Sequence, residues 1–193
     1  MKKPLLVIVT GLPGTGKTAM ARRLAQRFDL PLIHKDGYKE ILFDAFGWSD
    51  PEWSHQLSKA SFQIQFHTLE ILLKASVSCL AEGNFDARQA SPEFQKLQAR
   101  QPHQVLQIVC VTDGPVLWQR FLKRAGAQHR HPGHTESGGP ERFREMLLAG
   151  RSPSLDLEGM IMEVDTTDFA QVNYPSLYQA IRQRLTWQDP EED

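Results

Sequence analysis

The 193-residue sequence predicts an α/β protein built on a doubly wound, parallel β-sheet. The first observation is that short apolar runs rich in β-branched residues alternate with segments of helical periodicity along nearly the whole chain. The second is a glycine-rich stretch, Gly11–Thr18, placed directly between the first apolar run and the first helical segment. Parallel sheets of this kind bind ligands at the carboxyl ends of their strands, so we expect a site beside that stretch.

The expected strands are short apolar runs that end in polar or glycine residues, and we place five of them at 5–10, 31–34, 77–81, 105–111 and 160–164. The expected helices lie at 17–28, 37–46, about 51–75, 91–101, 115–125, 141–149 and 174–187. We expect Pro51 at an early position of the third helix and Ser91 as the cap of the fourth. The third helix carries apolar residues on two faces, one including Ile64 and Ile71, so we expect it to lie between two layers.

The chain length and composition indicate one domain spanning residues 1–193, with 40% hydrophobic and 23% charged residues. Within it we distinguish a helical insertion at about 37–76, a polar loop or lid at about 126–140 and an acidic tail at 189–193. The two cysteines, Cys79 and Cys110, lie in apolar runs and are expected to be buried thiols.

Charge and hydropathy argue against a membrane protein and against a protein whose overall charge attracts nucleic acid. A net charge of −1 provides no overall field for nucleic acid, although a local basic groove remains open. No run approaches the roughly 18 apolar residues of a membrane span. The first apolar stretch follows two lysines but runs straight into the glycine-rich loop, so we interpret it as a strand and not a signal peptide. We therefore expect a cytoplasmic enzyme without a membrane partner.

Residues 11–18 read Gly-Leu-Pro-Gly-Thr-Gly-Lys-Thr and fit the phosphate-binding pattern G-x-x-x-x-G-K-[ST]. Backbone N–H groups of such a loop point at a phosphate, and the following helix adds its positive N-terminal dipole. We expect Lys17 to reach the β- and γ-phosphates of a nucleotide and the Thr18 hydroxyl to bind Mg²⁺. The expected nucleotide contacts are Gly11, Pro13, Gly14, Thr15, Gly16, Lys17, Thr18, Ala19, Arg124 and Thr166.

Carboxylates follow three of the expected strands. Asp36 comes soon after the second strand, where a carboxylate could accept the proton of an acceptor hydroxyl and orient its oxygen. The alternative is a turn, because Asp-Gly is a common turn pair. Glu82 closes the third strand and could bind Mg²⁺ or be the base itself. Asn84 and Asp86 would then be further contacts to substrate or metal. The alternative is that the segment Glu82–Asp86 is a helix cap or a turn. We favour a turn and helix start for Asp113.

Three arginines precede or enter the polar loop at 126–140. Arg120 and Arg124 are one helical turn apart, and Arg130 follows within the loop. An arginine carried by a closing lid can neutralise a phosphoryl transition state, and we choose Arg124 and Arg130 as catalytic residues. The alternative is a solvated basic helix face.

Two other polar segments have more than one interpretation. His129, His131 and His134 could in principle bind zinc, but a fourth ligand at suitable spacing is missing, so we favour contacts within a lid or with substrate. The segment Asp165–Asp168 follows the fifth strand and is either close to the nucleotide base or a polar turn.

Taken together, these motifs resemble the P-loop kinase-like proteins grouped with AAA-type ATPases, relatives of zeta toxins, chloramphenicol phosphotransferase, gluconate kinase and polynucleotide 5′-kinases. The resemblance spans about residues 5–168. It is carried by Gly11–Thr18, Asp36, Glu82–Asp86, Arg124 with Arg130–His134, and Val164–Thr167.

The resemblance implies a three-layer fold with a five-stranded parallel sheet of order 2-3-1-4-5 and a helical lid. It also implies ATP with Mg²⁺, an aspartate base matching Asp36 and lid arginines matching Arg124 and Arg130. The resemblance does not identify the molecule that accepts the phosphoryl group. We expect the insertion at 37–76 to choose the acceptor, with Trp48, Trp53 and Phe62 either lining that site or, as we favour, packing in the core.

Our first hypothesis for the function is transfer of the ATP γ-phosphoryl group to a small-molecule hydroxyl. The alternatives are a polynucleotide or nucleotide-sugar kinase, or a switch that hydrolyses ATP without an acceptor. A strand ending in Asp-Glu, expected of a ring-forming ATPase, and an Asn-Lys-x-Asp guanine motif are both absent from the sequence.

Overall fold

The computed structural model describes residues 3–125, 131–134 and 140–186. Its five strands form one all-parallel sheet in the order β2-β3-β1-β4-β5, which confirms the expected architecture and strand order. The strands are β1 (Leu5–Gly11), β2 (Leu32–His34), β3 (Cys79–Glu82), β4 (Gln104–Val111) and β5 (Met160–Asp165). The acidic tail at 189–193 and much of the expected lid lie outside the described residues.

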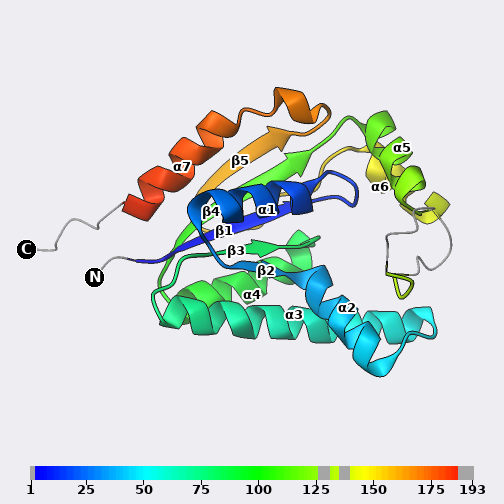
Figure 1. Ribbon diagram of the computed structural model, residues 1–193, viewed down its shortest axis with the longest axis horizontal. Coiled ribbons are helices and arrows are strands. Elements are labelled where there is room, and N and C mark those ends of the chain that lie inside the picture. Colours follow the sequence, from blue (N-terminus) through cyan, green and yellow to red (C-terminus); the bar gives the residue numbers. More distant parts are fainter. Residues whose placement is uncertain (1–2, 126–130, 135–139, 187–193) are drawn as a thin grey trace, which may run out of the picture.

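The helices alternate with the strands along the chain (Figure 1). They are α1 (Lys17–Phe28), α2 (Lys35–Phe46), α3 (Pro51–Lys74), α4 (Ala87–Arg100), α5 (Gly114–Ala125), α6 (Arg144–Leu148) and α7 (Tyr174–Thr186). Two short 3₁₀ turns, η1 (Pro140–Phe143) and η2 (Phe169–Gln171), precede α6 and α7. No helix in the described residues is both long and apolar enough to cross a membrane.

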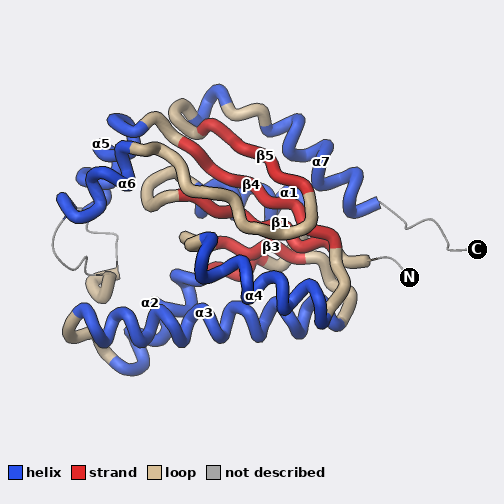
Figure 2. The backbone as a smooth tube through the Cα atoms, turned by 180° about the vertical axis from the view of Figure 1, so that it is seen from behind, coloured by secondary structure: helices blue, strands red, loops and turns tan. Residues whose placement is uncertain are grey.

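The sheet is the middle layer of three, with α1 and α7 on one face and α3 and α4 on the other (Figures 1 and 2). Side chains of a strand point alternately to the two faces. On β1, Leu5, Val7 and Val9 pack in the cluster with α1 and α7, whereas Leu6 and Ile8 pack in the cluster with α3 and α4. Because β1 is covered on both faces, its unbroken apolar sequence is what this position requires.

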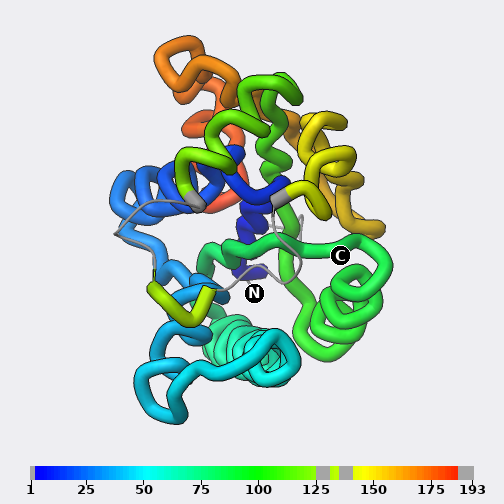
Figure 3. The backbone as a smooth tube through the Cα atoms, turned by 90° about the vertical axis from the view of Figure 1, so that its right-hand side faces the viewer, coloured from blue at the N-terminus to red at the C-terminus, as the bar shows by residue number. Residues whose placement is uncertain are grey.

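A third, smaller cluster lies at the carboxyl edge of the sheet, onto which Figure 3 looks. Leu12 of the glycine-rich loop packs there against Leu117 and Phe121 of α5 and Leu147 of α6. This cluster fixes the glycine-rich loop relative to α5 and α6. Since β1 lies between β3 and β4 in the sheet, the segments that follow all three strands meet at this edge.

Two predictions about the helices were wrong. The fourth helix begins at Ala87, with Asp86 as its cap, because the Asp86 carboxylate accepts a hydrogen bond from the Arg88 amide. Ser91 is instead a buried interior residue whose hydroxyl accepts a hydrogen bond from the Asp156 amide. The third helix buries one face only, since Ile71 is 54% exposed.

The expected core role of the insertion's aromatic residues is only partly confirmed. Phe62 packs against the cluster with α3 and α4. Trp48 is 48% exposed and Trp53 is 37% exposed, with the Trp53 indole donating to the Gly47 carbonyl. These two residues lie where α2 turns into α3, beyond the sheet that could cover them (Figure 1). Both cysteines are free and buried, as expected.

Candidate active site

The glycine-rich loop has the conformation of an anion site. It connects β1 to α1, and Thr15 closes it because both its amide and its hydroxyl donate to the Leu12 carbonyl, at 3.2 and 2.9 Å. Gly16 adopts a left-handed conformation with φ of 81°, and a side chain there would collide with the Phe169 ring. Among the residues that the structure describes, no side chain caps α1, so the first amides of this helix remain available to a bound anion.

The predicted phosphate-binding residues form one segment from the end of β1 to the first turn of α1: Gly11, Pro13, Gly14, Thr15, Gly16, Lys17, Thr18 and Ala19. The Thr15 hydroxyl is used within the loop, and Ala19 is exposed on the first turn of α1.

Lys17 is the buried charge at the centre of this edge, with only 5% of its surface exposed. Burial lowers the pKa of Lys17, and the negative charges of Glu82 and Asp36 oppose that effect only in part. An ammonium group held here without full compensation attracts an anion such as a phosphate.

A cavity of about 190 Å³ brings four predicted residues together: Lys17, Thr18, Asp36 and Arg124 line it. They come from α1, α2 and α5, and Asn84 also contributes to the lining. Arg124 is exposed, and its charge further lowers the pKa of Lys17. Arg130, the second arginine chosen from the sequence, lies outside the described residues.

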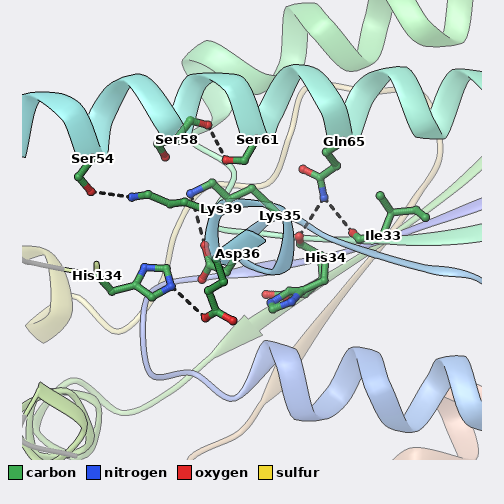
Figure 4. Close-up of polar contacts among 12 residues, drawn as sticks. Ile33, His34, Lys35, Asp36, Lys39, Ser54, Ser58, Ser61, Gln65 and His134 are labelled. Carbon is green, nitrogen blue, oxygen red and sulfur yellow. Dashed lines mark hydrogen bonds and ion pairs between the residues drawn. The ribbon is translucent and has the colours of Figure 1, made fainter. Parts of the chain in front are cut away.

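Asp36 lies in the first turn of α2, where its carboxylate is 3.3 Å from the Lys35 ammonium. Burial alone would raise the pKa of Asp36, but Lys35, His134, Lys17 and His34 outweigh it and lower the pKa to about 2. In Figure 4 the carboxyl group lies among Lys35, His34 and His134. Asp36 is therefore ionised at neutral pH and can accept a hydrogen bond from a hydroxyl.

Glu82 ends β3 and is 2% exposed. Its Oε2 lies 2.7 Å from His34 Nε2, yet this oxygen has no hydrogen bond of acceptable geometry within the described residues. Burial lowers the pKa of His34, but Glu82 and Asp36 more than offset this and the pKa is raised. His34 therefore holds the Glu82 carboxylate at the end of β3, and a cation or its water would share the carboxylate with this histidine. Oxygen donors such as Glu82 and Thr18 suit Mg²⁺.

Gln65 of α3, which the sequence analysis did not single out, holds the ends of β2 and β3 together. Its Nε2 donates to the carbonyls of Ile33 and Glu82, at 2.9 and 3.0 Å (Figure 4). This clamp fixes the positions from which Asp36 and Glu82 project. No local signal marks Gln65, because its importance depends on which helix packs across the sheet.

Arg120 holds a loop instead of lining the cavity. Its guanidinium donates to the carbonyls of Thr166 and Thr167, at 2.9 and 2.7 Å, and lies 4.8 Å from the Phe169 ring centre. Thr166 is fully buried and its hydroxyl donates to the Val111 carbonyl at 2.8 Å. The loop after β5 is thus fixed beside Gly16. Thr166, predicted to contact the nucleotide, has its hydroxyl bonded within the protein.

Asp113 directly precedes α5 and caps it, as the turn interpretation predicts, because its carboxylate accepts a hydrogen bond from the Val116 amide at 3.2 Å. Asp86 has the same role at α4. Neither carboxylate therefore needs a metal to explain its position.

The described part of the expected lid, His131–His134, packs on α2. His131 Nε2 lies 3.1 Å from Asp44 Oδ1, and His134 Nε2 lies 3.0 Å from Glu40 Oε1. The His131 ring stacks on Phe43 with a centroid distance of 5.2 Å. The described residues contain no group of three His, Cys, Asp or Glu side chains arranged for a metal. His129, the third histidine of the zinc alternative, lies outside the described residues.

The acidic partners of these histidines were missed at the sequence level. Glu40 and Asp44 are four residues apart and share a face of α2, while His131 and His134 are three apart. This matching spacing was visible in the sequence, but nothing in it showed that the two segments meet.

A larger cavity of about 550 Å³ adjoins the first, and both are lined by Pro13, Asn84 and Phe143. It extends along the start of the glycine-rich loop to the first turn of α4 and to residues 151–153. Asn84 and Asp86, predicted as further contacts, both line it. The site therefore has a small compartment with the catalytic candidates and a larger one beside it.

Comparison with known proteins supports the same assignment of fold. A family model described as "AAA domain" matches residues 6–145. A protein from Chloroflexus aurantiacus, described as a candidate kinase, is 37% identical and superposes with a TM-score of 0.89, covering 95% of this chain and 99% of that one.

More distant structures share the fold. A gluconokinase from Sinorhizobium meliloti is 15% identical with a TM-score of 0.56, and 96% of each chain is covered. A sugar kinase from Janibacter sp. is 14% identical with a TM-score of 0.53, and 94% of each chain is covered. No curated protein matches the sequence significantly.

Proposed function

Since this chain belongs to the AAA domain family and has the fold of P-loop kinases, we propose that it transfers the γ-phosphoryl group of ATP to a hydroxyl of a small molecule. The observation that carries the proposal is the 190 Å³ cavity in which Lys17, Thr18, Asp36 and Arg124 converge. A phosphate-binding lysine, an ionised aspartate and an arginine are the groups that phosphoryl transfer requires.

The donor side is formed by the glycine-rich loop and α1. Loop amides and Lys17 bind the β- and γ-phosphates, which gives the buried ammonium its missing counter-charge. Thr18 and Glu82 are the oxygen donors that would hold Mg²⁺, the latter directly or through water. When bound, this ion neutralises charge on the phosphate oxygens.

On the acceptor side, Asp36 receives a hydrogen bond from the acceptor hydroxyl and aims its oxygen at the γ-phosphorus. A bond forms between the oxygen of the acceptor hydroxyl and the γ-phosphorus. At the same time the bond from the γ-phosphorus to the β–γ bridging oxygen breaks, and ADP leaves. The hydroxyl proton passes to the Asp36 carboxylate as the new bond forms. Because a carboxylate with a pKa of about 2 is a weak base, its main contribution is orientation.

Arg124 neutralises charge on the transferring group, and Arg130 is proposed for the same role. We also propose that the segment containing His131–His134 is the lid, held on α2 through Glu40 and Asp44. Such a lid would exclude water, which otherwise competes with the acceptor. We propose a single domain, expected in the cytoplasm, in which α2 supplies Asp36 to the acceptor. The described lining of the two cavities includes no residue of the insertion at 37–76, so its expected role in choosing the acceptor gains no support from them.

The test is a screen for transfer of radiolabelled γ-phosphate from ATP to sugars, hydroxy acids, nucleosides, antibiotics, nucleotide sugars and oligonucleotide ends. Wild type is compared with Lys17→Ala, and with Lys96→Ala as a control at an exposed lysine of α4. We expect transfer to a small molecule that Lys17→Ala abolishes and the control retains.

Unchanged kinetics in Lys17→Ala would refute the donor assignment. Transfer to oligonucleotide ends alone would favour a polynucleotide kinase, and ATP hydrolysis without transfer to any compound would favour a switch.

A further inference from the structure

The 550 Å³ cavity next to the catalytic compartment has a mixed lining that suits a specific class of small molecule. Its volume falls in the range of roughly 300–1,000 Å³ found for small-molecule sites. Apolar walls come from Leu12, Phe85, Phe143, Met146 and Pro153. Because it shares walls with the compartment of Lys17 and Asp36, a molecule bound here can extend a hydroxyl toward Asp36.

Two arginines give the cavity a surplus of positive charge. Arg88 lies in the first turn of α4, and its guanidinium makes no ion pair or hydrogen bond within the described residues. Arg151 is 3.8 Å from Glu163, but both side chains are more than half exposed, so this pair contributes little. Asp86 is the one acidic residue in the described lining, and its carboxylate already caps α4 by accepting from the Arg88 amide.

Ser152 is a second polar residue in the wall of the cavity. It lines the same cavity, and its hydroxyl oxygen is buried without a hydrogen-bond partner within the described residues. A buried polar atom left unpaired costs about 1–3 kcal/mol, so such atoms usually have a partner in the functional state. Its neighbour along the chain is Arg151, which places a hydroxyl and a guanidinium on the same wall.

We propose that this cavity binds the phosphoryl acceptor and that Arg88 and Arg151 select an acceptor carrying a carboxylate or phosphate group besides its hydroxyl. The inference rests on the proposed function and names its substrate class. Guanidinium groups form paired hydrogen bonds with both anions, and the apolar walls accommodate the carbon skeleton. A neutral acceptor offers neither guanidinium such a paired hydrogen bond.

The first experiment measures anion binding independently of catalysis. The protein is loaded with Mg²⁺ and the non-hydrolysable analogue AMP-PNP, so that the glycine-rich loop is occupied, and is titrated with inorganic phosphate and with acetate by NMR. The variants are Arg88→Gln and Arg151→Gln, both at exposed side chains. Arg100→Gln, at the other end of α4, is the matched control.

We expect phosphate or acetate to bind the loaded wild type, each cavity variant to weaken that binding at least fivefold, and the control to match wild type. The stronger of the two anions indicates whether the acceptor group is a phosphate or a carboxylate. Absence of anion binding to wild type, or equal binding in all variants, overturns the inference.

The second experiment uses matched pairs of acceptors: glycerate and glycerol, ribose 5-phosphate and ribose, glucose 6-phosphate and glucose. We expect transfer to charged members, with a KM raised at least tenfold in Arg88→Gln and Arg151→Gln and a kcat within threefold of wild type. Preferential transfer to neutral members refutes the inference but supports the proposed function. Loss of transfer to every compound, with anion binding intact, contradicts the proposed function while the anion site stands.

Discussion

Replacing Asp36 by Asn separates the role of this residue in catalysis from its role in stability. The substitution keeps the size of the side chain and removes its charge from a cluster that contains Lys17, His34, Lys35 and His134. In the proposed reaction the amide has no negative charge with which to hold and orient the acceptor hydroxyl, and it cannot accept the hydroxyl proton. We expect kcat for phosphoryl transfer to fall by about 10²- to 10⁴-fold, while the KM for ATP changes little.

The effect on stability follows from the depressed pKa of Asp36. A shift from 3.8 to about 2 corresponds to roughly 2.5 kcal/mol at about 1.4 kcal/mol per unit. Because the side chain is 33% exposed, solvent screening reduces this to about 1 kcal/mol. A depressed carboxyl pKa stabilises the folded state fully above the unfolded pKa, and this contribution is lost as the pH falls toward 2.

Urea denaturation at pH 7 should therefore show Asp36→Asn less stable than wild type by about 1 kcal/mol, with a smaller difference near pH 3. Glu93→Gln, at an exposed carboxylate of α4, is the control and should match wild type. The pH profile of kcat should lack an acidic limb attributable to Asp36 above pH 4. A wild-type limb near pH 5 that disappears in Asp36→Asn would falsify the assignment of a strongly depressed pKa.

Three further predictions concern residues that shape the site. Gly16→Ala forces a side chain against the Phe169 ring, so the KM for ATP should rise at least tenfold in steady-state assays, and Phe169→Ala should partly restore it; no rescue would contradict this contact. Gly133→Ala places a Cβ 2.6 Å from Phe43 atoms, so it should loosen the lid and raise ATP hydrolysis relative to transfer, and an unchanged ratio would argue against a lid. Gln65→Leu leaves two strand-end carbonyls unpaired and should lower the free energy of unfolding by about 1–3 kcal/mol in urea, with a smaller change in the KM for ATP than in kcat.

The sequence was informative wherever a short stretch of chain specifies its own geometry. The glycine-rich loop is one example, because glycine spacing, the lysine and the flanking strand and helix all lie within about fifteen residues. Strand–helix alternation predicted the parallel sheet for the same reason. Asp36 could be chosen because the end of a strand in such a sheet is at the ligand-binding edge wherever the strand lies.

Predictions from the sequence were wrong where two local signals compete. Ser91 before Pro92 resembles a helix start, but Asp86 begins the helix five residues earlier, so the cap could not be chosen from spacing alone. On α3, Leu69 and Ile71 are equally apolar, yet only Leu69 faces the sheet. Burial depends on which face of the helix packs against another layer, and the apolar pattern alone does not specify that face.

By itself, therefore, the sequence determined the phosphate-binding turn, the class of fold and the edge at which chemistry can occur, because each depends on interactions between near neighbours in the chain. Only the tertiary structure decided that Arg124 lines the compartment of Lys17 while Arg120 is bonded to the loop after β5. It also decided that His134 meets Glu40, 94 positions away. Contacts over such separations depend on how whole layers pack, since helices of similar composition can present different residues to the same edge.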